Sequence, residues 1–327
     1  MAHSVSEVDT LTTSTWAYRM VAPRSFRKTT ESRPSRIDPG EIEVELLAAG
    51  ICGSDLPKFA AGGPPGGGAP SGFPMHECVG RVARAGRDSS ATGRLALALP
   101  PGDRGLRGHF TAPAGEYLLL DEQWSDSSRW PAATLVQPLA TVLFGADRLR
   151  DVRGREVVVL GCGPVGLLHS LVARARGARR VVGVDPRPVT DSPEDFGLDA
   201  IVRHAGELPS SCADLCIEAV GHQDRTMAAA VRLTRTDGEI MAFGVPDPSA
   251  VYRVPFEVFF RKRLTLRAAA GTPWTPYLER AEAFALRHTA AMTALVSHVL
   301  PMSQVQRAFE LASGPAPHRR KVVLVSG

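Results

Sequence analysis

The stretch Glu156–Asp185, EVVVLGCGPVGLLHSLVARARGARRVVGVD, decides the fold. It opens with an apolar, β-branched run, Val157–Leu160, which predicts a buried strand. Three glycines follow with the spacing G-x-G-x-x-G, and a helix-length segment, Leu167–Arg176, comes next. Gly177 ends that helix, and a second apolar run, Val181–Val184, closes the stretch. Strand, glycine turn, helix and strand in this order predict a βαβ dinucleotide-binding unit.

Each glycine of the motif has a physical role. Gly161 permits the tight turn out of the strand, and Gly166 lets the helix pack closely on it. Gly163 lacks a Cβ, so a pyrophosphate can approach the backbone. Pro164 and Val165 lie between the last two glycines, directly before the helix, whose N-terminal free N–H groups and partial positive charge attract phosphate. We therefore assign cofactor binding to these five residues.

Asp185 predicts which dinucleotide is used. It lies 19 residues after Gly166 and can accept hydrogen bonds from a ribose diol. A carboxylate there repels a 2′-phosphate, which favours NAD over NADP, although the nearby Arg187 weakens this preference. Val245 follows a later strand and is a further candidate for cofactor contact. The alternative is an ordinary βαβ unit whose glycines only shape a turn.

Composition is typical of a globular protein, and the length is sufficient for two domains. The chain has 327 residues, of which 44% are hydrophobic and 22% charged. The net charge of +4 is small and scattered, so we expect no nucleic-acid partner. No apolar run reaches membrane-spanning length and the polar N-terminus lacks a secretory signal, so we expect a cytoplasmic protein with no membrane partner. Its five cysteines form no disulfide pattern.

The parts of the chain before and after residue 150 differ in their pattern of predicted strands and helices. Strands at Trp16–Val21 and Glu41–Leu47 belong to a β-rich opening part interrupted by Pro and Gly. After residue 150, strands alternate with helices, which suggests a domain boundary. We predict further strands at Ala200–Val202, Ala213–Ile217, Glu239–Phe243 and Leu264–Ala268, helices at His222–Leu233 and Pro276–Arg287, and a short or broken helix over Pro186–Pro193.

Two short segments of the β-rich part carry metal-binding chemistry. Cys52 and Asp55 lie three residues apart just beyond a strand, with the hydroxyl of Ser54 between them. His76 and Glu77 follow the glycine-rich stretch 62–72, which is either a surface loop or a lid. Alone, Cys52 reads as a buried thiol and the His-Glu pair as structural. Together, thiolate, imidazole and carboxylate suit a catalytic zinc ion with a position left for water or substrate.

The chain resembles the zinc-dependent medium-chain dehydrogenases/reductases, which are alcohol dehydrogenase-like, near the branch of sorbitol and threonine dehydrogenases. The matching motifs are GICGSD at 50–55, HE-x2-G-x5-G at 76–86, QPLATVLFGADRL at 137–149, GCGPVG at 161–166, SHVLP at 297–301 and KVVLV at 321–325. The resemblance implies an α/β protein: a GroES-like β-rich catalytic domain plus a Rossmann domain with a doubly wound parallel sheet. The catalytic domain would be discontinuous, over 1–138 and 272–327, with the Rossmann domain over 139–271.

The resemblance also implies roles for single residues. Cys52 and His76 would be zinc ligands, and Glu77 a ligand or near-ligand that exchanges with water. Ser54 would begin the proton relay from the substrate hydroxyl. Lys321 stands where the family often has a basic residue near the cofactor phosphates.

Four departures from the family pattern matter for the metal. Gln137 replaces the branch's usual glutamate ligand, and its neutral amide oxygen is a weaker donor. The family's relay histidine is missing, because its neighbourhood reads Leu56-Pro57-Lys58, so the proton leaves by Lys58 or by water. No cysteine occurs between Cys78 and Cys162, so we predict no structural zinc. Met75 stands in place of a glycine.

The resemblance and the site residues together predict an NAD-dependent oxidoreductase. It would oxidise a secondary alcohol, a polyol or a cyclitol reversibly to a ketone with one catalytic zinc ion. We expect a homodimer or a homotetramer. Gln137 leaves open a metal-free NAD(P)H-dependent quinone or enoyl reductase of the same fold. A nucleotide-binding protein that senses redox state or scaffolds partners is the third alternative.

Overall fold

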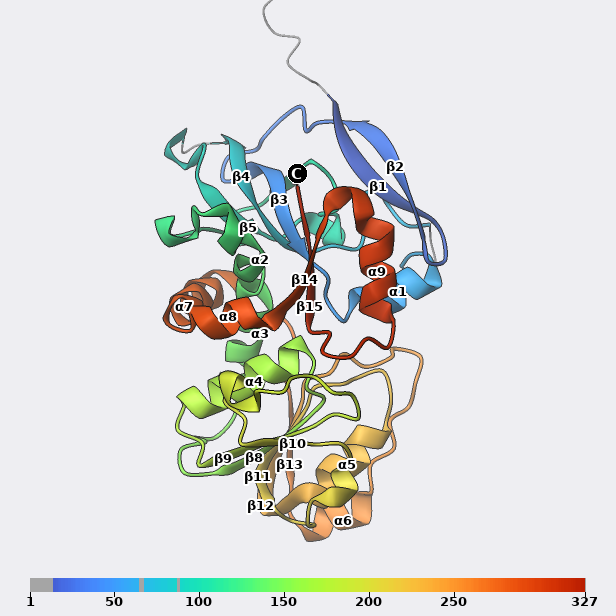
Figure 1. Cartoon of the computed structure of the whole chain (residues 1–327), viewed down its shortest axis with the longest axis vertical. Helices are drawn as coiled ribbons and strands as arrows, with labels where there is room; N and C mark the ends of the chain where they lie inside the picture. The colour runs from blue at the N-terminus through green and yellow to red at the C-terminus, as the bar shows by residue number, and fades with distance from the viewer. Residues whose placement is uncertain (1–13, 65–67, 87–88, 327) are drawn as a thin grey trace, which may run out of the picture.

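A computed structural model describes residues 14–64, 68–86 and 89–326. Two lobes lie one above the other, with helices packed between them (Figure 1). One lobe, residues 156–268, is built on a parallel sheet and is called the parallel lobe here. The other, residues 14–124 and 296–325, is built on a mixed sheet and is called the mixed lobe. The α/β architecture predicted from the sequence is therefore confirmed.

The parallel lobe is a doubly wound sheet. Its described strands have the order β10-β9-β8-β11-β12-β13, and every pair is parallel. The strands are β8 (Glu156–Leu160), β9 (Arg180–Val184), β10 (Ala200–Val202), β11 (Ala213–Glu218), β12 (Thr234–Ala242) and β13 (Thr265–Ala268); the helices are α4 (Pro164–Ala175), α5 (Arg225–Leu233) and α6 (Phe256–Arg261). The order reverses at β8, and such a switch point is where dinucleotides bind.

The mixed lobe combines early strands of the chain with its last two strands in one sheet of order β14-β15-β3-β4-β5-β7, with β6 also paired to β3. The strands are β3 (Ile42–Gly50), β4 (Glu77–Ala85), β5 (Leu95–Ala98), β6 (His109–Ala112), β7 (Tyr117–Leu119), β14 (Val296–Pro301) and β15 (Lys321–Val325). A hairpin of β1 (Ser14–Ala22) and β2 (Ser25–Ser32), and the helices α1 (Asp55–Ala61) and α9 (Val305–Ser313), pack beside it. The chain thus returns to its first lobe, while the domain boundaries at 138 and 271 stay a prediction.

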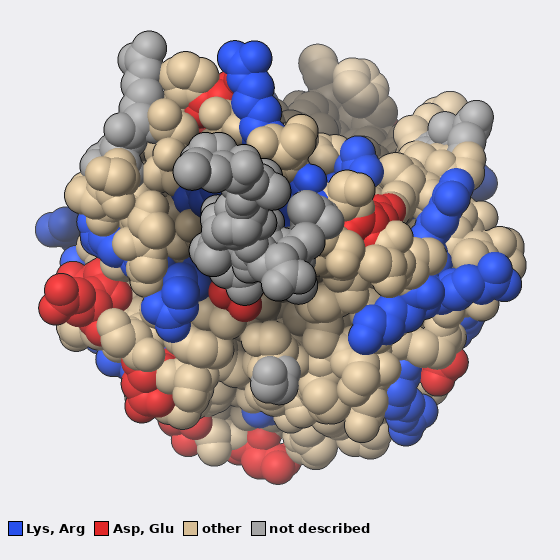
Figure 2. Space-filling model, turned by 90° about the horizontal axis from the view of Figure 1, so that it is seen from above, with Lys and Arg blue, Asp and Glu red and all other residues tan. Residues whose placement is uncertain are grey.

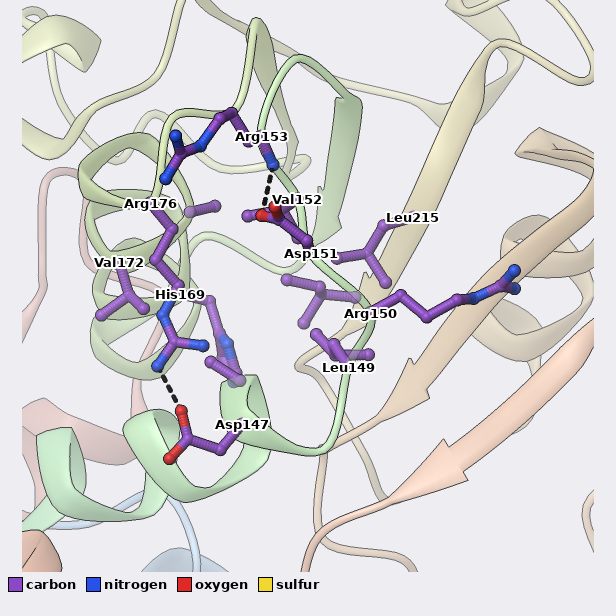
Figure 3. Close-up of a pocket in the computed structure, with 13 residues that line it drawn as sticks. Asp147, Leu149, Arg150, Asp151, Val152, Arg153, His169, Val172, Arg176 and Leu215 are labelled. Carbon is purple, nitrogen blue, oxygen red and sulfur yellow. Dashed lines mark hydrogen bonds and ion pairs between the residues drawn. The ribbon is translucent and has the colours of Figure 1, made fainter.

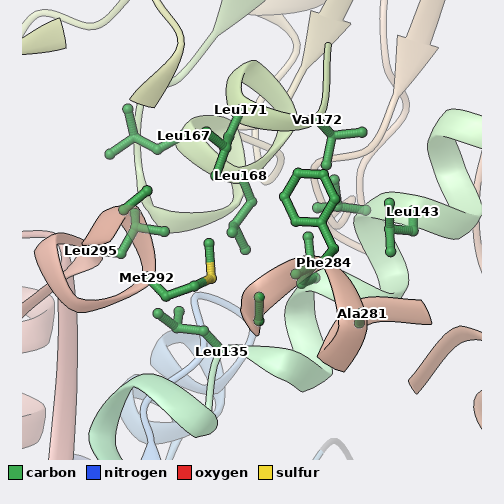
Figure 4. Packing of buried hydrophobic residues seen from close by; sticks show 14 of the residues in the cluster. Leu135, Leu143, Leu167, Leu168, Leu171, Val172, Ala281, Phe284, Met292 and Leu295 are labelled. Carbon is green, nitrogen blue, oxygen red and sulfur yellow. The ribbon is translucent and has the colours of Figure 1, made fainter. Parts of the chain in front are cut away.

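A helical layer holds the lobes together. It contains α2 (Trp130–Ala133), α3 (Val136–Asp147), α7 (Trp274–Arg287) and α8 (Thr289–Leu295). Leucine and phenylalanine side chains of this layer meet the apolar face of α4, as Leu143, Leu168 and Phe284 illustrate (Figure 4). Because one buried cluster spans the junction, the two lobes share a core.

Ion pairs reinforce the same junction. Asp147 at the end of α3 binds Arg176 after α4 and Arg280 of α7, each at 2.6 Å. The Asp147–Arg176 pair borders a cavity of about 290 Å³ (Figure 3). His169 also lines this cavity. None of its described lining residues is among the site residues predicted from the sequence.

Several predicted elements are shifted. The helix predicted from His222 begins only at Arg225, because His222 has a left-handed backbone with φ of 54°. Over 186–193 the chain forms no α-helix, and a single 3₁₀ turn follows at Pro193–Phe196, as its prolines predicted. In the strand predicted over Glu41–Leu47, Glu43 is fully buried, and its carboxylate forms ion pairs with Arg33 and Arg84.

Short 3₁₀ turns complete the described chain at Ser89–Ala91, Pro101–Asp103, Glu122–Trp124, Ser127–Arg129, Ala205–Glu207 and Met302–Gln304. The polar N-terminus and residues 65–67 of the stretch proposed as a lid lie outside the described residues. Among the described helices, none is both long and apolar enough to cross a lipid bilayer. Basic and acidic side chains are interspersed on the face shown in Figure 2.

Candidate active site

The glycine turn of the parallel lobe has the geometry that its sequence predicts. Gly161 has φ of +89°, a conformation that favours glycine. A Cβ on Gly166 would lie 1.8 Å from the carbonyl oxygen of Gly161, so only glycine permits this approach of helix and strand. A Cβ on Gly163 would meet no protein atom within 4 Å. The motif is therefore tight at two glycines and open at the third, where a ligand can approach.

A groove of about 1010 Å³ runs along this turn and between the lobes. The predicted cofactor residues that line it are Gly161, Gly163, Pro164, Val165, Asp185, Arg187 and Lys321. Val245 instead lines a second cavity described below, which also contains Val165. Gly166 is buried beneath the turn and acts through packing.

Asp185 sits at the end of β9 and is only 2% exposed. Its carboxylate accepts a hydrogen bond from the backbone N–H of Cys162 at 3.0 Å. The guanidinium group of Arg187 donates to both carboxylate oxygens, at 3.0 and 2.9 Å, and these bonds raise the pKa of Arg187. A ligand hydroxyl at this position therefore competes with Arg187 for the carboxylate.

Strand pairing brings the metal-binding residues together. Gly50 at the end of β3 is paired with Glu77 at the start of β4, so Cys52 and His76 emerge at the same edge. The ligand atoms of Cys52, His76 and Glu77 all lie within 4.8 Å of one another. A Cβ on Gly50 would lie 2.4 Å from Glu77 Oε2, so this glycine makes room for the carboxylate.

Glu77 is fully buried and forms an ion pair with Lys321, which is itself 2% exposed. The sequence placed Lys321 near the cofactor phosphates, and it does line the groove. Its ammonium group, however, is held by Glu77. The second oxygen of that carboxylate, Oε1, is buried without a hydrogen-bond partner among the described residues.

Asp55 supports the other two ligands. It accepts a hydrogen bond from the backbone N–H of Cys52 at 2.9 Å. Its other oxygen lies 3.3 Å from His76 Nδ1, although the two atoms are not aligned as a hydrogen bond. Burial lowers the pKa of His76, but the carboxylate of Asp55 and the thiol of Cys52 outweigh it and raise that pKa well above its usual value. The site therefore favours positive charge.

Beside these ligands lies a cavity of about 430 Å³. Cys52, Ser54, His76 and Gln137 line it, and Gln137 is 5% exposed. Ser54 precedes α1 but makes no capping hydrogen bond with its side chain, so its hydroxyl is available to a ligand. The sequence missed four further lining residues, Thr141, His222, Phe243 and Trp274. They come from separate elements, and no motif connects them.

The donor set fits zinc. A thiolate, an imidazole and a carboxylate are common zinc ligands, and the histidine has a carboxylate beside its second nitrogen. The unpartnered oxygen of Glu77 is a buried group that a cation would satisfy. Gln137 adds a neutral oxygen at the same cavity.

Comparisons with known proteins find zinc-binding and polyol dehydrogenases among the similar proteins. The family model described as zinc-binding dehydrogenase matches residues 164–285. Sorbitol dehydrogenase of Bombyx mori is 21% identical over 325 residues, which cover 86% of this chain and 90% of that protein. L-idonate 5-dehydrogenase of Vitis vinifera is 25% identical over 340 residues, covering 85% and 86%. The structure of L-idonate 5-dehydrogenase from Escherichia coli superposes with a TM-score of 0.79 at 18% identity, covering 95% of this chain and 98% of that one.

The solved structure shows the likeness of fold, and the family model and the relatives carry the likeness of sequence. The chain is therefore an oxidoreductase whose residues 164–285 match the zinc-binding dehydrogenase family, and its sequence is similar to the sorbitol dehydrogenase-like branch of the zinc-dependent, alcohol dehydrogenase-like medium-chain dehydrogenases/reductases.

Proposed function

We propose that the chain oxidises a secondary alcohol or polyol reversibly to a ketone, with one zinc ion and a nicotinamide dinucleotide. One observation carries the proposal: Cys52, His76 and Glu77 converge within 4.8 Å beside a cavity that also contains Val165 of the glycine turn. A site for a Lewis acid and a site for a hydride acceptor thus border the same space.

Each group has a defined task in this proposal. Bound zinc supplies Lewis acidity toward the alcohol oxygen, and the nicotinamide supplies the hydride acceptor. Cys52, His76 and Glu77 would hold the metal. The hydroxyl of Ser54 lines the same cavity and would relay the proton of the substrate hydroxyl to water, donating its own proton as it accepts that of the substrate. Phe243 and Trp274 form apolar walls that reduce access of water to the reacting atoms.

The cavity supports a small polyhydroxylated substrate. A volume of about 430 Å³ suits a small molecule. Polar side chains of Ser54, Gln137 and Thr141 share it with the rings of Phe243 and Trp274. Relatives named sorbitol dehydrogenase and L-arabinitol 4-dehydrogenase support sugar alcohols as the first substrates to test, and the relative named L-idonate 5-dehydrogenase adds a hydroxylated sugar acid as the second.

NAD is the proposed dinucleotide, because Asp185 offers a buried carboxylate to the ribose diol. Arg187 would then give up part of its contact with that carboxylate. The comparison to make is kcat/KM with NAD and with NADP, for the wild type and for Asp185→Ser. We expect the wild type to favour NAD at least about tenfold and the variant to lose most of that preference, since one good hydrogen bond to a charged group is worth about 1.5–3 kcal/mol. Equal or better use of NADP by the wild type would refute this choice.

A second copy of the chain is the proposed partner of the parallel lobe. Strand β13 is the edge of its sheet and exposes Leu266. Phe256 and Phe260 of the neighbouring α6 are 69% and 71% exposed. An unpaired edge beside exposed aromatic rings is a surface that another such edge can cover. Light scattering should give twice the chain mass or more, and Leu266→Lys should reduce it to that of a monomer; a wild-type monomer would refute the proposal.

The central experiment removes the metal. Prolonged chelation, checked by elemental analysis, should abolish oxidation of sugar alcohols, and zinc should restore it. A protein purified without zinc that still reduces quinones or enones would instead support the metal-free reductase. Absence of turnover on alcohols, ketones, quinones and enones would support a nucleotide-binding protein without catalysis.

A further inference from the structure

A second carboxylate approaches the same nitrogen of His76. Asp103 Oδ1 lies 3.7 Å from His76 Nδ1, on the atom that Asp55 also faces. Lys58 connects the two carboxylates: its ammonium group donates to Asp103 Oδ2 at 2.6 Å and lies 3.7 Å from Asp55 Oδ1. Asp103 comes from a segment 27 residues beyond His76 that none of the sequence motifs includes.

The backbone around Asp103 is built to hold it there. Gly102 and Asp103 both have left-handed conformations, with φ of 66° and 57°. The N–H of Gly105 donates to the carbonyl of Met75 at 2.9 Å, directly before His76. The N–H of Leu106 donates to the carbonyl of Gly72 at 2.7 Å. The loop is therefore tied to the segment directly before His76, and Asp103 occupies a conformation that costs energy in an ordinary residue.

The charges of the site explain why a second carboxylate is useful. Glu77 is neutralised by Lys321, and Gln137 carries no charge. Cys52, as a thiolate, thus supplies most of the negative charge of the candidate ligands. Carboxylates behind a ligating histidine orient its ring and increase its basicity. Asp103 adds a second such carboxylate, and because Asp55 and Asp103 share the single ammonium group of Lys58, the pair keeps a net negative charge beside His76.

We propose that Asp103, anchored by Lys58, is a positioning residue that orients His76 together with Asp55 and strengthens zinc binding. The inference rests on the proposed zinc site. It assigns a role to Asp103 and Lys58, which lie outside the ligand set. Lys58 also lies 5.3 Å from the centre of the Phe73 ring, which restricts its side chain and thereby the carboxylates that it contacts.

The test is the zinc dissociation constant of metal-depleted full-length protein, measured by competition with a chromophoric chelator. Asp103→Asn removes the charge, and Asn tolerates the same left-handed backbone. Asp237→Asn is the matched control, because Asp237 also has a left-handed backbone, with φ of 60°, and pairs with Arg263 at 2.6 Å, far from the site in sequence. We expect Asp103→Asn to weaken zinc binding about tenfold and Asp237→Asn to leave it unchanged.

A second variant guards against a folding defect. Asp103→Gly suits the backbone at least as well and should show the same loss of affinity. The melting temperature of each metal-free variant provides the structural readout. Zinc affinity unchanged in both variants, with or without a lower melting temperature, would overturn the positioning role and leave the zinc site intact. A wild-type protein that binds no zinc would overturn the proposed function itself, so the two failures are distinguishable.

Discussion

Each lobe contains a histidine close to its site, half-buried in the mixed lobe and buried in the parallel lobe, and the two have opposite surroundings. His76 of the mixed lobe faces Asp55, Asp103 and the thiol of Cys52, and its pKa is raised. His169 of α4 is 1% exposed and packs edge-to-face on Phe243, with ring centroids 4.4 Å apart. Burial, and to a lesser degree Arg176, lowers its pKa to about 3.

The difference shows how the two lobes achieve binding. In the mixed lobe, side chains with buried charges converge from several segments and create a place for a cation. In the parallel lobe, backbone atoms around glycines form the site, and the nearby histidine stays neutral in the core. The first site should therefore be sensitive to changes of charge, and the second to the addition of a single methyl group.

The largest expected effect is the loss of the thiolate. Cys52→Ser should reduce kcat/KM for alcohol oxidation on the order of 10³-fold, because metal-ion stabilisation is worth several kcal/mol. Cys212→Ser is the matched control, since Cys212 is also a half-buried free thiol but lines neither the groove nor the cavity beside the zinc ligands. Similar activity in both variants would show that Cys52 is not a ligand.

The next effect concerns the buried ion pair of the mixed lobe. Lys321→Met leaves the carboxylate of Glu77 buried without its partner and should cost about 3–5 kcal/mol of unfolding free energy in the metal-free protein. Bound zinc should recover part of this loss. Lys262→Met, which removes hydrogen bonds only to neutral carbonyl groups, should cost less in denaturant titrations. Equal costs would argue against a charge effect.

His169 predicts a pH dependence of stability. Its pKa is about 3 in the folded chain against about 6.5 when unfolded, so the unfolded state binds more protons between these values. The contribution of His169 to the free energy of unfolding should be complete above pH 6.5. It should fall by about 1.4 kcal/mol per pH unit as the pH drops toward 4. His169→Leu should remove this contribution to the slope, whereas the exposed His204→Leu should not. An unchanged slope in His169→Leu would contradict the buried neutral histidine.

The smallest expected effects come from alanine substitutions at two glycines of the same turn, one of which should lower stability and the other cofactor affinity. Gly166→Ala places a Cβ 1.8 Å from the carbonyl oxygen of Gly161 and should destabilise the chain by about 1–3 kcal/mol. Gly163→Ala meets no protein atom within 4 Å, so the melting temperature should hold while the dissociation constant of the dinucleotide rises. Calorimetry and cofactor titration measure the two quantities. Equal loss of stability in both variants would remove the assignment of Gly163 to ligand contact.

The same difference explains what could be predicted from the sequence. The glycine turn and Asp185 were predictable, because their functions depend on residues that are close in sequence and on local backbone geometry. Cys52, His76 and Glu77 were singled out by residue type and by resemblance, and the pairing of β3 with β4 brings them together.

Other features depend on long-range contacts. Asp103 and Lys321 lie far in sequence from the candidate zinc ligands, and only folding brings them close. No local sequence pattern therefore indicated the pairs Asp103–Lys58 and Glu77–Lys321. His222 was predicted to begin a helix. In the structure it has a left-handed backbone and lines the cavity. Phe243 and Trp274 lie far apart in sequence, and only the folded chain places both in the wall of the cavity.

X-ray absorption at the zinc edge tests the central claim most directly. For the wild type loaded with one equivalent of zinc, the account predicts one sulfur neighbour at about 2.3 Å together with lighter nitrogen or oxygen neighbours. Cys52→Ser should lose the sulfur neighbour, and Cys212→Ser should keep it. A wild-type spectrum without sulfur, or with sulfur that persists in Cys52→Ser, would contradict the proposed metal centre.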